Sequence, residues 1–239
     1  MGKTSVARVL LESLNKEHFI PVYAPWGEIG GKSFEVVCWQ LCNRLHEEAV
    51  RVQPDLEAIN LPSAEEFERG FNQATVGFIR RIRTTSRRNI IIVLDDFDDV
   101  PDWVYSGATG DLFFSMLKTL TGSRGISLIF VGGQRLRTIM QSPVAGKLNQ
   151  VTPVDLGYLP EEAMPQLIRG TTGVLQFSET AIHRIIYLSA CNPFYASRIC
   201  NRLWDYMIER RWKYVVAEDI ERTVNETVSY DDSPLFSHF

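Results

Sequence analysis

Five consecutive apolar residues, Ile90-Ile91-Ile92-Val93-Leu94, constrain the fold more than any other stretch of the chain, and they end at Asp95-Asp96. A β-branched run without polar alternation is typical of a strand buried on both faces of a parallel sheet. Residues 126–131 form a second run of this kind, which two glycines follow. We also expect strands over residues 19–24 and 151–156. With helical patterns between these runs, the sequence predicts an α/β fold built on a parallel sheet.

Amphipathic helices are predicted between the strands. Ser33 is placed to cap one of them, and Ser63 and Glu66 have the spacing of a capping box. The apolar spacing after that box continues to Ile82, which predicts one uninterrupted helix. The predicted helices of this part cover residues 4–16, 34–49, 63–82 and 112–120.

After Leu159 the strand patterns stop. Pro160 stands where a first helical residue tolerates proline. Further helices are predicted over residues 178–188, 193–209 and 217–228. We therefore expect two domains, an α/β core over residues 1–159 and an all-helical subdomain over residues 160–239.

Composition excludes several classes of protein. The chain has 239 residues, of which 45% are hydrophobic and 11% aromatic, so it is predicted to be globular rather than disordered. No window approaches about 18 consecutive apolar residues, and no secretory signal pattern is present, so we expect a cytoplasmic protein with no membrane partner. Cys38, Cys42, Cys191 and Cys200 lack the spacing of structural zinc ligands and are predicted to be ordinary core cysteines.

The chain begins Met1-Gly2-Lys3-Thr4-Ser5, which matches the end of a phosphate-binding loop of the form G-x-x-x-x-G-K-[ST]. In such a loop backbone N–H groups bind the phosphates, the lysine reaches the β- and γ-phosphate oxygens, and the hydroxyl is a Mg²⁺ ligand. Gly2, Lys3 and Thr4 hold its last three positions. The tripeptide alone is a weak signal, because it occurs by chance in many proteins.

Asp95 and Asp96 follow a buried strand at the edge where open α/β sheets bind their ligands. In nucleotide-hydrolysing folds the first such acid holds Mg²⁺ through water and the second polarises the attacking water. A solvated acidic turn is the simpler interpretation, but the order of the two motifs favours a nucleotide site. Arg135, in the turn after the next strand, is a candidate for phosphate contact. Its alternative is an ordinary exposed arginine at a helix start.

Four segments together resemble the STAND-type ATPases of the AAA+-like P-loop NTPases. They are Gly2-Lys3-Thr4-Ser5, Leu94-Asp95-Asp96-Phe97-Asp98, Phe130-Val131-Gly132-Gly133 and Leu156-Gly157-Tyr158-Leu159-Pro160-Glu161-Glu162. The resemblance implies a P-loop NTPase core, an αβα sandwich with a parallel sheet, followed by an all-helical lid. It implies ATP and Mg²⁺ as cofactors, with Thr4 and Asp95 as metal ligands and Lys3 and Asp96 as catalytic residues. Nucleotide contacts would come from Met1 to Ser5 and from Arg135.

The lid of such proteins carries a Gly-x-Pro motif whose proline packs on the adenine. Here Cys191-Asn192-Pro193 takes that place, with cysteine where glycine is usual. The resemblance therefore implies an adenine contact for Pro193, and a proline at the first position of a helix is the structural alternative. Asp96 stands where many relatives carry glutamate. Its shorter side chain predicts slow hydrolysis and a switch-like cycle.

The predicted function is an ATP-binding, slowly hydrolysing regulatory switch module of a larger signalling or defence protein. Its expected partners are ATP, further copies of itself, or other domains of the same longer chain. One alternative is a nucleic-acid-handling AAA+ ATPase of the initiator or transposition-helper type, in which an arginine cluster contacts DNA. That cluster comprises Arg80, Arg81, Arg83, Arg87 and Arg88. The formal net charge of −4 gives no global reason for such binding. The other alternative is a degenerate, non-hydrolysing interaction scaffold.

The phosphate loop has only Met1 before Gly2, whereas the full motif needs five residues there. It also needs the strand that leads into the loop. We therefore expect a chain truncated at its N-terminus within the Walker A motif, lacking the first strand.

Overall fold

Strand β2 (Asn89–Asp95) lies at the centre of a parallel sheet, with β1 (Phe19–Pro25) on one side and β3 (Ile126–Phe130) on the other. The computed structural model describes residues 2–31, 33–148 and 151–230. It contains two compact units, one spanning Lys3–Pro153 and one formed mainly from Val154 onward. This division precedes the boundary that we expected after Leu159.

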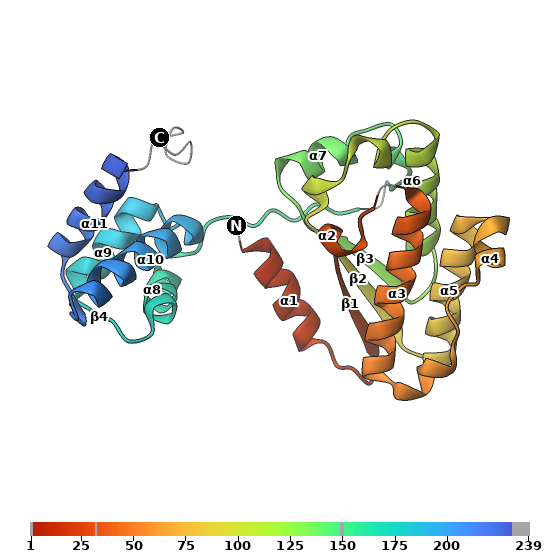
Figure 1. The fold of residues 1–239 in the computed structure, drawn as a ribbon, viewed down its shortest axis with the longest axis horizontal. Coiled ribbons are helices and arrows are strands. Elements are labelled where there is room, and N and C mark those ends of the chain that lie inside the picture. Colours follow the sequence, from red (N-terminus) through yellow and green to blue (C-terminus); the bar gives the residue numbers. More distant parts are fainter. Residues whose placement is uncertain (1, 32, 149–150, 231–239) are drawn as a thin grey trace. The chain divides into compact units, whose positions relative to one another are not determined.

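The two faces of the sheet are covered by different helices (Figure 1). On one face Ala7 and Leu11 of α1 pack with Val93 of β2. On the other, α3, α5 and α6 contribute to a larger core that contains Ile92. The predicted αβα sandwich is confirmed for this unit. Its helices and 3-10 turns are α1 (Lys3–Ser13), α2 (Trp26–Ile29), α3 (Phe34–Val52), η1 (Pro54–Ala58), α4 (Ala64–Arg69), α5 (Phe71–Ser86), η2 (Phe97–Asp99), η3 (Asp102–Val104), α6 (Gly107–Thr121), α7 (Gln134–Met140) and η4 (Ala145–Leu148).

The helix predicted over residues 63–82 is wrong as a single element. Its start is correct, since Ser63 and Glu66 form the capping box. However, Gly70 has φ 156°, a backbone conformation that residues with a Cβ rarely adopt, and it separates α4 from α5. On either side of this glycine, Phe67 and Phe71 stack on each other with ring centroids 5.3 Å apart.

Strand β3 differs from the prediction of a strand buried on both faces. Ile126 is buried, but most of the strand is only partly buried. Among the described residues β3 has β2 as its one strand partner, so its other edge is unpaired. The strand predicted over residues 151–156 is also wrong, because that stretch forms no ladder, and Val154 is 79% exposed. Apolar residues in sequence are not sufficient for a strand without a neighbour to pair with.

The second unit is helical, with its own core around Ile168, Ile182 and Leu203. Ser178 caps α9 through the N–H of Ala181. A short parallel ladder that we did not expect joins two residue pairs. The elements of this unit are η5 (Glu161–Ala163), α8 (Met164–Thr172), β4 (Gln176–Phe177), α9 (Glu179–Ser189), α10 (Pro193–Glu209), β5 (Tyr214–Val215) and α11 (Ala217–Tyr230).

Candidate functional site

The carboxyl end of β2 presents Asp95 on the face of the sheet that α1 covers. Side chains alternate along a strand, so Asp95 shares its face with Val93, which packs with Ala7 and Leu11 of α1. That helix begins at Lys3. The structure therefore places the Gly-Lys-Thr helix and the first acid of the acidic block on the same side of the sheet.

The Asp95 carboxylate is held by two protein donors. Its Oδ2 accepts a hydrogen bond of 2.8 Å from the Tyr23 hydroxyl, and its Oδ1 accepts one of 2.8 Å from the N–H of Asp96. Asp95 is only 1% exposed. Burial, followed by the Asp95 contact, raises the pKa of Tyr23, so this hydroxyl stays protonated and donates at neutral pH. Tyr23 was not among the predicted site residues, because no local pattern links two residues on different strands.

Asp96 has a different environment from Asp95. It is exposed, and its φ of 53° lies in the left-handed region, where aspartate is one of the few residues with a Cβ found at appreciable frequency. Partial desolvation raises its pKa, and the charges of Asp95, Asp99 and Asp98 raise it further, while Arg8 acts in the opposite direction. The two neighbouring acids thus differ in burial, since Asp95 is buried and Asp96 is exposed.

The N-terminal loop residues lie at the start of α1. Gly2 is exposed with φ 88°, and a Cβ there would have no atom within 4 Å. Lys3 and Thr4 are half-buried and Ser5 is exposed, all in the first turn. The first N–H groups of a helix have no intrahelical acceptor, which suits this turn to an anion. Met1, predicted to contact nucleotide, lies outside the described residues.

Arg135 is bound within the protein. Its guanidinium donates to the carbonyl oxygen of Asp98 at 2.8 Å, to Oδ1 of Asp102 at 3.0 Å and to the Tyr105 hydroxyl at 3.1 Å. The Tyr105 contact is the first cause of a raised pKa for Arg135. The predicted phosphate contact of Arg135 stays a prediction, and it would require exchange of these bonds.

Asp98 connects the loops that follow β2 and β3, a role that the sequence analysis missed. Its carboxylate accepts from the backbone N–H of Leu136 at 2.7 Å and from that of Gly133. A Cβ on Gly133 would lie 2.8 Å from Asp98 Oδ2, and one on Gly132 would lie 2.8 Å from the Leu136 Cβ. In the sequence, the Gly132-Gly133 pair was the feature that could have indicated this contact, because paired glycines often mark a close approach of another group.

In the second unit, Pro193 is the first residue of α10, and the Asn192 side chain caps that helix through the N–H of Phe194 at 3.0 Å. Cys191 has φ 59°, in the left-handed region that glycine adopts without cost. The position where the resembled family carries glycine is therefore one where the backbone favours glycine. The adenine contact of Pro193 stays a prediction.

The arginine cluster at the end of α5 makes several bonds to the protein itself. Arg80 donates to Ser123 Oγ, Arg81 to the carbonyl oxygen of Asn60, and Arg88 to the carbonyl oxygen of Glu17. These bonds hold the helix end against neighbouring loops. They favour a structural use of the arginines over an open patch for nucleic acid.

The cysteines show no zinc-like arrangement. Cys38, Cys42 and Cys200 are buried and free, and Cys191 is half-buried. Burial raises the pKa of each of the three buried thiols to about 12. Among the described residues no group of three or more His, Cys, Asp or Glu side chains could hold a metal ion. None of the described helices is both long and apolar enough to cross a membrane.

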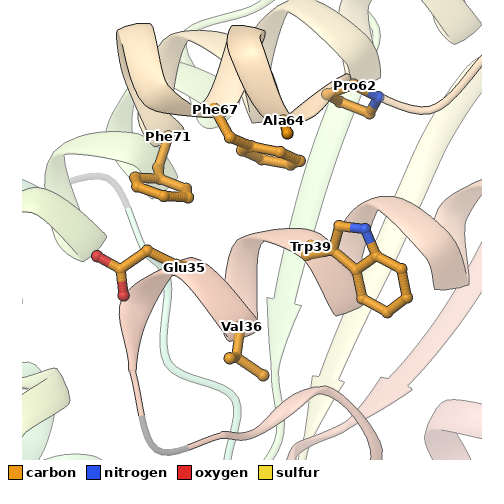
Figure 2. A pocket seen from close by; sticks show the side chains of 7 residues that line it. All are labelled: Glu35, Val36, Trp39, Pro62, Ala64, Phe67 and Phe71. Carbon is orange, nitrogen blue, oxygen red and sulfur yellow. The ribbon is translucent and has the colours of Figure 1, made fainter.

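An apolar groove of about 340 Å³ lies between α3 and the α4–α5 pair (Figure 2). Its large exposed apolar residues are Trp39, at 51%, and Val36, at 40%. None of the residues predicted to bind nucleotide contributes to it. The lining residues are Glu35, Val36, Trp39, Pro62, Ala64, Phe67 and Phe71.

Comparison with known proteins connects this geometry to a family. Residues 1–140 match the family described as AAA domain. The ORC2 protein of Aeropyrum pernix, solved as ADPNP–ADP complexes, is 11% identical with a TM-score of 0.60, and the match covers 94% of this chain and 58% of ORC2. A mutant of Thermotoga maritima RuvB is 14% identical with a TM-score of 0.46, over 98% of this chain and 70% of RuvB. No curated protein matches the chain in sequence. At such identity the likeness to ORC2 shows the fold alone. The family match spans more than half of the 239 residues, and the chain therefore belongs to the AAA domain family.

Proposed function

We propose that this chain is the ATP-binding module of a STAND-type regulatory switch within a larger protein, and that it uses Mg²⁺. The observation that carries the proposal is the common face of the sheet shared by Asp95 and α1, the helix that begins with Lys3 and Thr4. This arrangement supports the proposal, because it leaves the residues proposed to bind phosphate and the acid proposed to bind the cation on the same side of the sheet. ORC2, whose fold the chain shares, was solved with ADPNP and ADP.

The residues present fit a Mg²⁺-nucleotide complex. Mg²⁺ is usually held by one or two carboxylates together with phosphate oxygens and waters rather than by an all-protein cage. A single buried carboxylate at Asp95 and the hydroxyl of Thr4 match that donor set, and the described acids form no ready cation cage. When bound, Mg²⁺ would neutralise charge on the phosphates. Lys3 and the N–H groups of the first turn of α1 would bind the phosphate oxygens.

Asp96 is proposed as the group that orients the attacking water. It is exposed, and its raised pKa makes it a better proton acceptor than an ordinary aspartate. Its side chain is one methylene shorter than glutamate. We therefore infer slow hydrolysis, which suits a switch that is read out by its nucleotide state.

We also infer that a further strand pairs with the open edge of β3 and leads into the phosphate loop. The unpaired edge and the half-exposed side chains of β3 support this. On α1, Val6 is 52% and Val9 is 63% exposed, so this helix has apolar surface left for the same strand.

The test is ATP binding by the full-length protein, measured by isothermal titration calorimetry in Mg²⁺. We expect Lys3→Ala to abolish binding, whereas Lys16→Ala, which removes an exposed lysine beyond the end of α1, should leave it unchanged. Retained hydrolysis in the Lys3→Ala protein would contradict the assignment of the site. If ATP does not bind the unaltered protein and does not raise its melting temperature, the non-hydrolysing scaffold is the better hypothesis.

The nucleic-acid alternative has its own test. Salt-dependent retention of the protein on DNA that is lost in the Arg81→Ala and Arg87→Ala variants would favour it. The internal bonds of Arg80, Arg81 and Arg88 count against an open DNA-binding patch at these residues.

A further inference from the structure

We propose that Tyr23 is a positioning residue for Asp95, and that through it α1 sets the Mg²⁺ dependence of nucleotide binding. This inference rests on the proposed function and adds to it a residue outside the phosphate loop and the acidic block. The observation that carries it is the position of the Tyr23 side chain, whose ring faces Arg8 of α1 and whose hydroxyl donates to the Asp95 carboxylate.

The register of the sheet brings the two residues together. Tyr23 of β1 pairs with Val93 of β2, so Asp95 is its diagonal neighbour two residues further along, on the same face. Diagonal neighbours are within reach of long aromatic side chains. The backbone of Tyr23 is held as well, because its carbonyl oxygen accepts a hydrogen bond of 2.8 Å from Arg44 Nε of α3.

The hydroxyl determines how the carboxylate can be used. The Tyr23 hydroxyl donates to Oδ2 and the Asp96 N–H donates to Oδ1, so each carboxylate oxygen has one protein donor. The carboxylate plane therefore cannot rotate freely. A carboxylate offers about four lone-pair sites, so one on each oxygen is left for a cation or for its bound water. Without the hydroxyl, Oδ2 of a residue only 1% exposed would lose its partner, and the carboxylate would turn to find another.

Arg8 joins Tyr23 to the helix that carries the phosphate loop. Its guanidinium lies 4.8 Å from the centre of the Tyr23 ring. Arg8 is four residues after Thr4 in α1, and residues with that spacing are neighbours on one helix face. A movement of α1 on binding phosphate would therefore act on Tyr23, and through it on Asp95, along a continuous set of contacts.

Groups that hold a metal ligand in place contribute measurably to metal binding, since their loss commonly costs 10- to 100-fold in affinity. Tyr23→Phe tests the hydroxyl alone, because it keeps the ring and its packing and removes only the hydroxyl. A purely structural role for Tyr23 would change ATP binding equally with and without Mg²⁺. A positioning role would change only the increase in ATP affinity that Mg²⁺ produces.

The experiment measures the Kd of the full-length protein for ATP in Mg²⁺ and in EDTA. The Mg²⁺ gain is the Kd in EDTA divided by the Kd in Mg²⁺. We expect Tyr23→Phe to lower that gain about 10-fold, with the Kd in EDTA within about 2-fold of the unaltered protein. Tyr187→Phe, at an exposed tyrosine of α9, is the matched control and should leave the gain unchanged. Arg8→Gln is a second variant at an exposed position, and it should lower the gain in the same direction, whereas Lys16→Gln should not.

The outcomes separate the two proposals. If the unaltered protein binds ATP with a Mg²⁺ gain and Tyr23→Phe keeps that gain, or loses affinity equally in both conditions, this inference is overturned and the proposed function stands. If the unaltered protein shows no Mg²⁺-dependent ATP binding, the proposed function is overturned, and the coupling with it.

Discussion

The carboxylate of Asp98, in the turn after β2, accepts a hydrogen bond of 2.7 Å from the backbone N–H of Leu136, in the helix after β3. The same carboxylate accepts from the N–H of Gly133. The two loops that border the candidate site are therefore held together by one side chain. The turn that contains Asp98 begins at Asp96, so these hydrogen bonds also help to fix the backbone of Asp96.

Removing the Asp98 carboxylate should destabilise the protein. Asp98→Ala leaves two backbone N–H groups without their acceptor, and hydrogen bonds to a charged group contribute about 1.5–3 kcal/mol each. We expect the free energy of unfolding in urea to fall by about 3 kcal/mol, the lower end for two such bonds. Asp99→Ala, at the exposed neighbouring acid, is the control and should change it far less. Equal effects of the two variants would show that Asp98 has no special role.

The close approach of Gly133 to Asp98 predicts a second effect. A methyl group at Gly133 would lie 2.8 Å from Asp98 Oδ2, so Gly133→Ala must displace the carboxylate. Overpacking of this kind costs about 1–3 kcal/mol. Gly146→Ala is the matched control, because a Cβ there has no atom within 4 Å. Thermal unfolding of both variants tests this, and a Gly133→Ala protein as stable as Gly146→Ala would refute the contact.

The raised pKa of Asp96 predicts a pH-dependent stability. The folded state binds this proton more tightly than the unfolded chain, so the free energy of unfolding falls as pH rises through the range just above the ordinary aspartate pKa. At pH 7 the ionised carboxylate therefore costs stability, and Asp96→Asn should raise the melting temperature. The gain is at most about 1 kcal/mol, because solvent screens an exposed group.

The pH series provides the control for that prediction. The advantage of Asp96→Asn should shrink at pH 3.5, which lies below the ordinary aspartate pKa and so below the raised pKa of Asp96. Asp205→Asn, at an exposed acid of α10, should show no comparable gain at pH 7. A gain from Asp96→Asn that is the same at both pH values would rule out relief of charge as its cause.

The left-handed backbone of Cys191 predicts a preference for glycine. Residues with a Cβ pay of order 1–3 kcal/mol in sparsely populated backbone regions, and glycine does not. Both Cys191→Gly and Cys191→Ala remove the sulfur, but only the glycine variant also removes the Cβ. We expect the glycine variant to be the more stable of the two by about 1 kcal/mol. An alanine variant of equal or greater stability in urea would contradict this.

Part of the site could be predicted because its signals are local. The run before Asp95 predicted β2, and the Ser63–Glu66 spacing predicted the start of a helix, as observed. Each depends on residues a few positions apart. Gly70 shows the limit of such patterns, because apolar spacing continued across it while its backbone, at φ 156°, separated two helices.

Contacts between elements could not be predicted in this way. Tyr23 and Asp95 are 72 residues apart, and Asp98 and Leu136 are 38 apart. The guanidinium of Arg135, a candidate phosphate ligand by its place in the sequence, donates to Asp98, Asp102 and Tyr105. Such partners depend on strand order and register, which no local pattern encodes.

The sequence by itself determined the parallel α/β core, the helical second part and the acids at the end of β2, because periodicity, caps and motif order act over a few residues. Only the tertiary structure decided that β3 has one unpaired edge among the residues that the structure describes, that residues 151–156 form no strand, and that Tyr23 holds Asp95. A strand needs a neighbour to satisfy its backbone, and a buried carboxylate needs a donor. Both are supplied by residues distant in the chain.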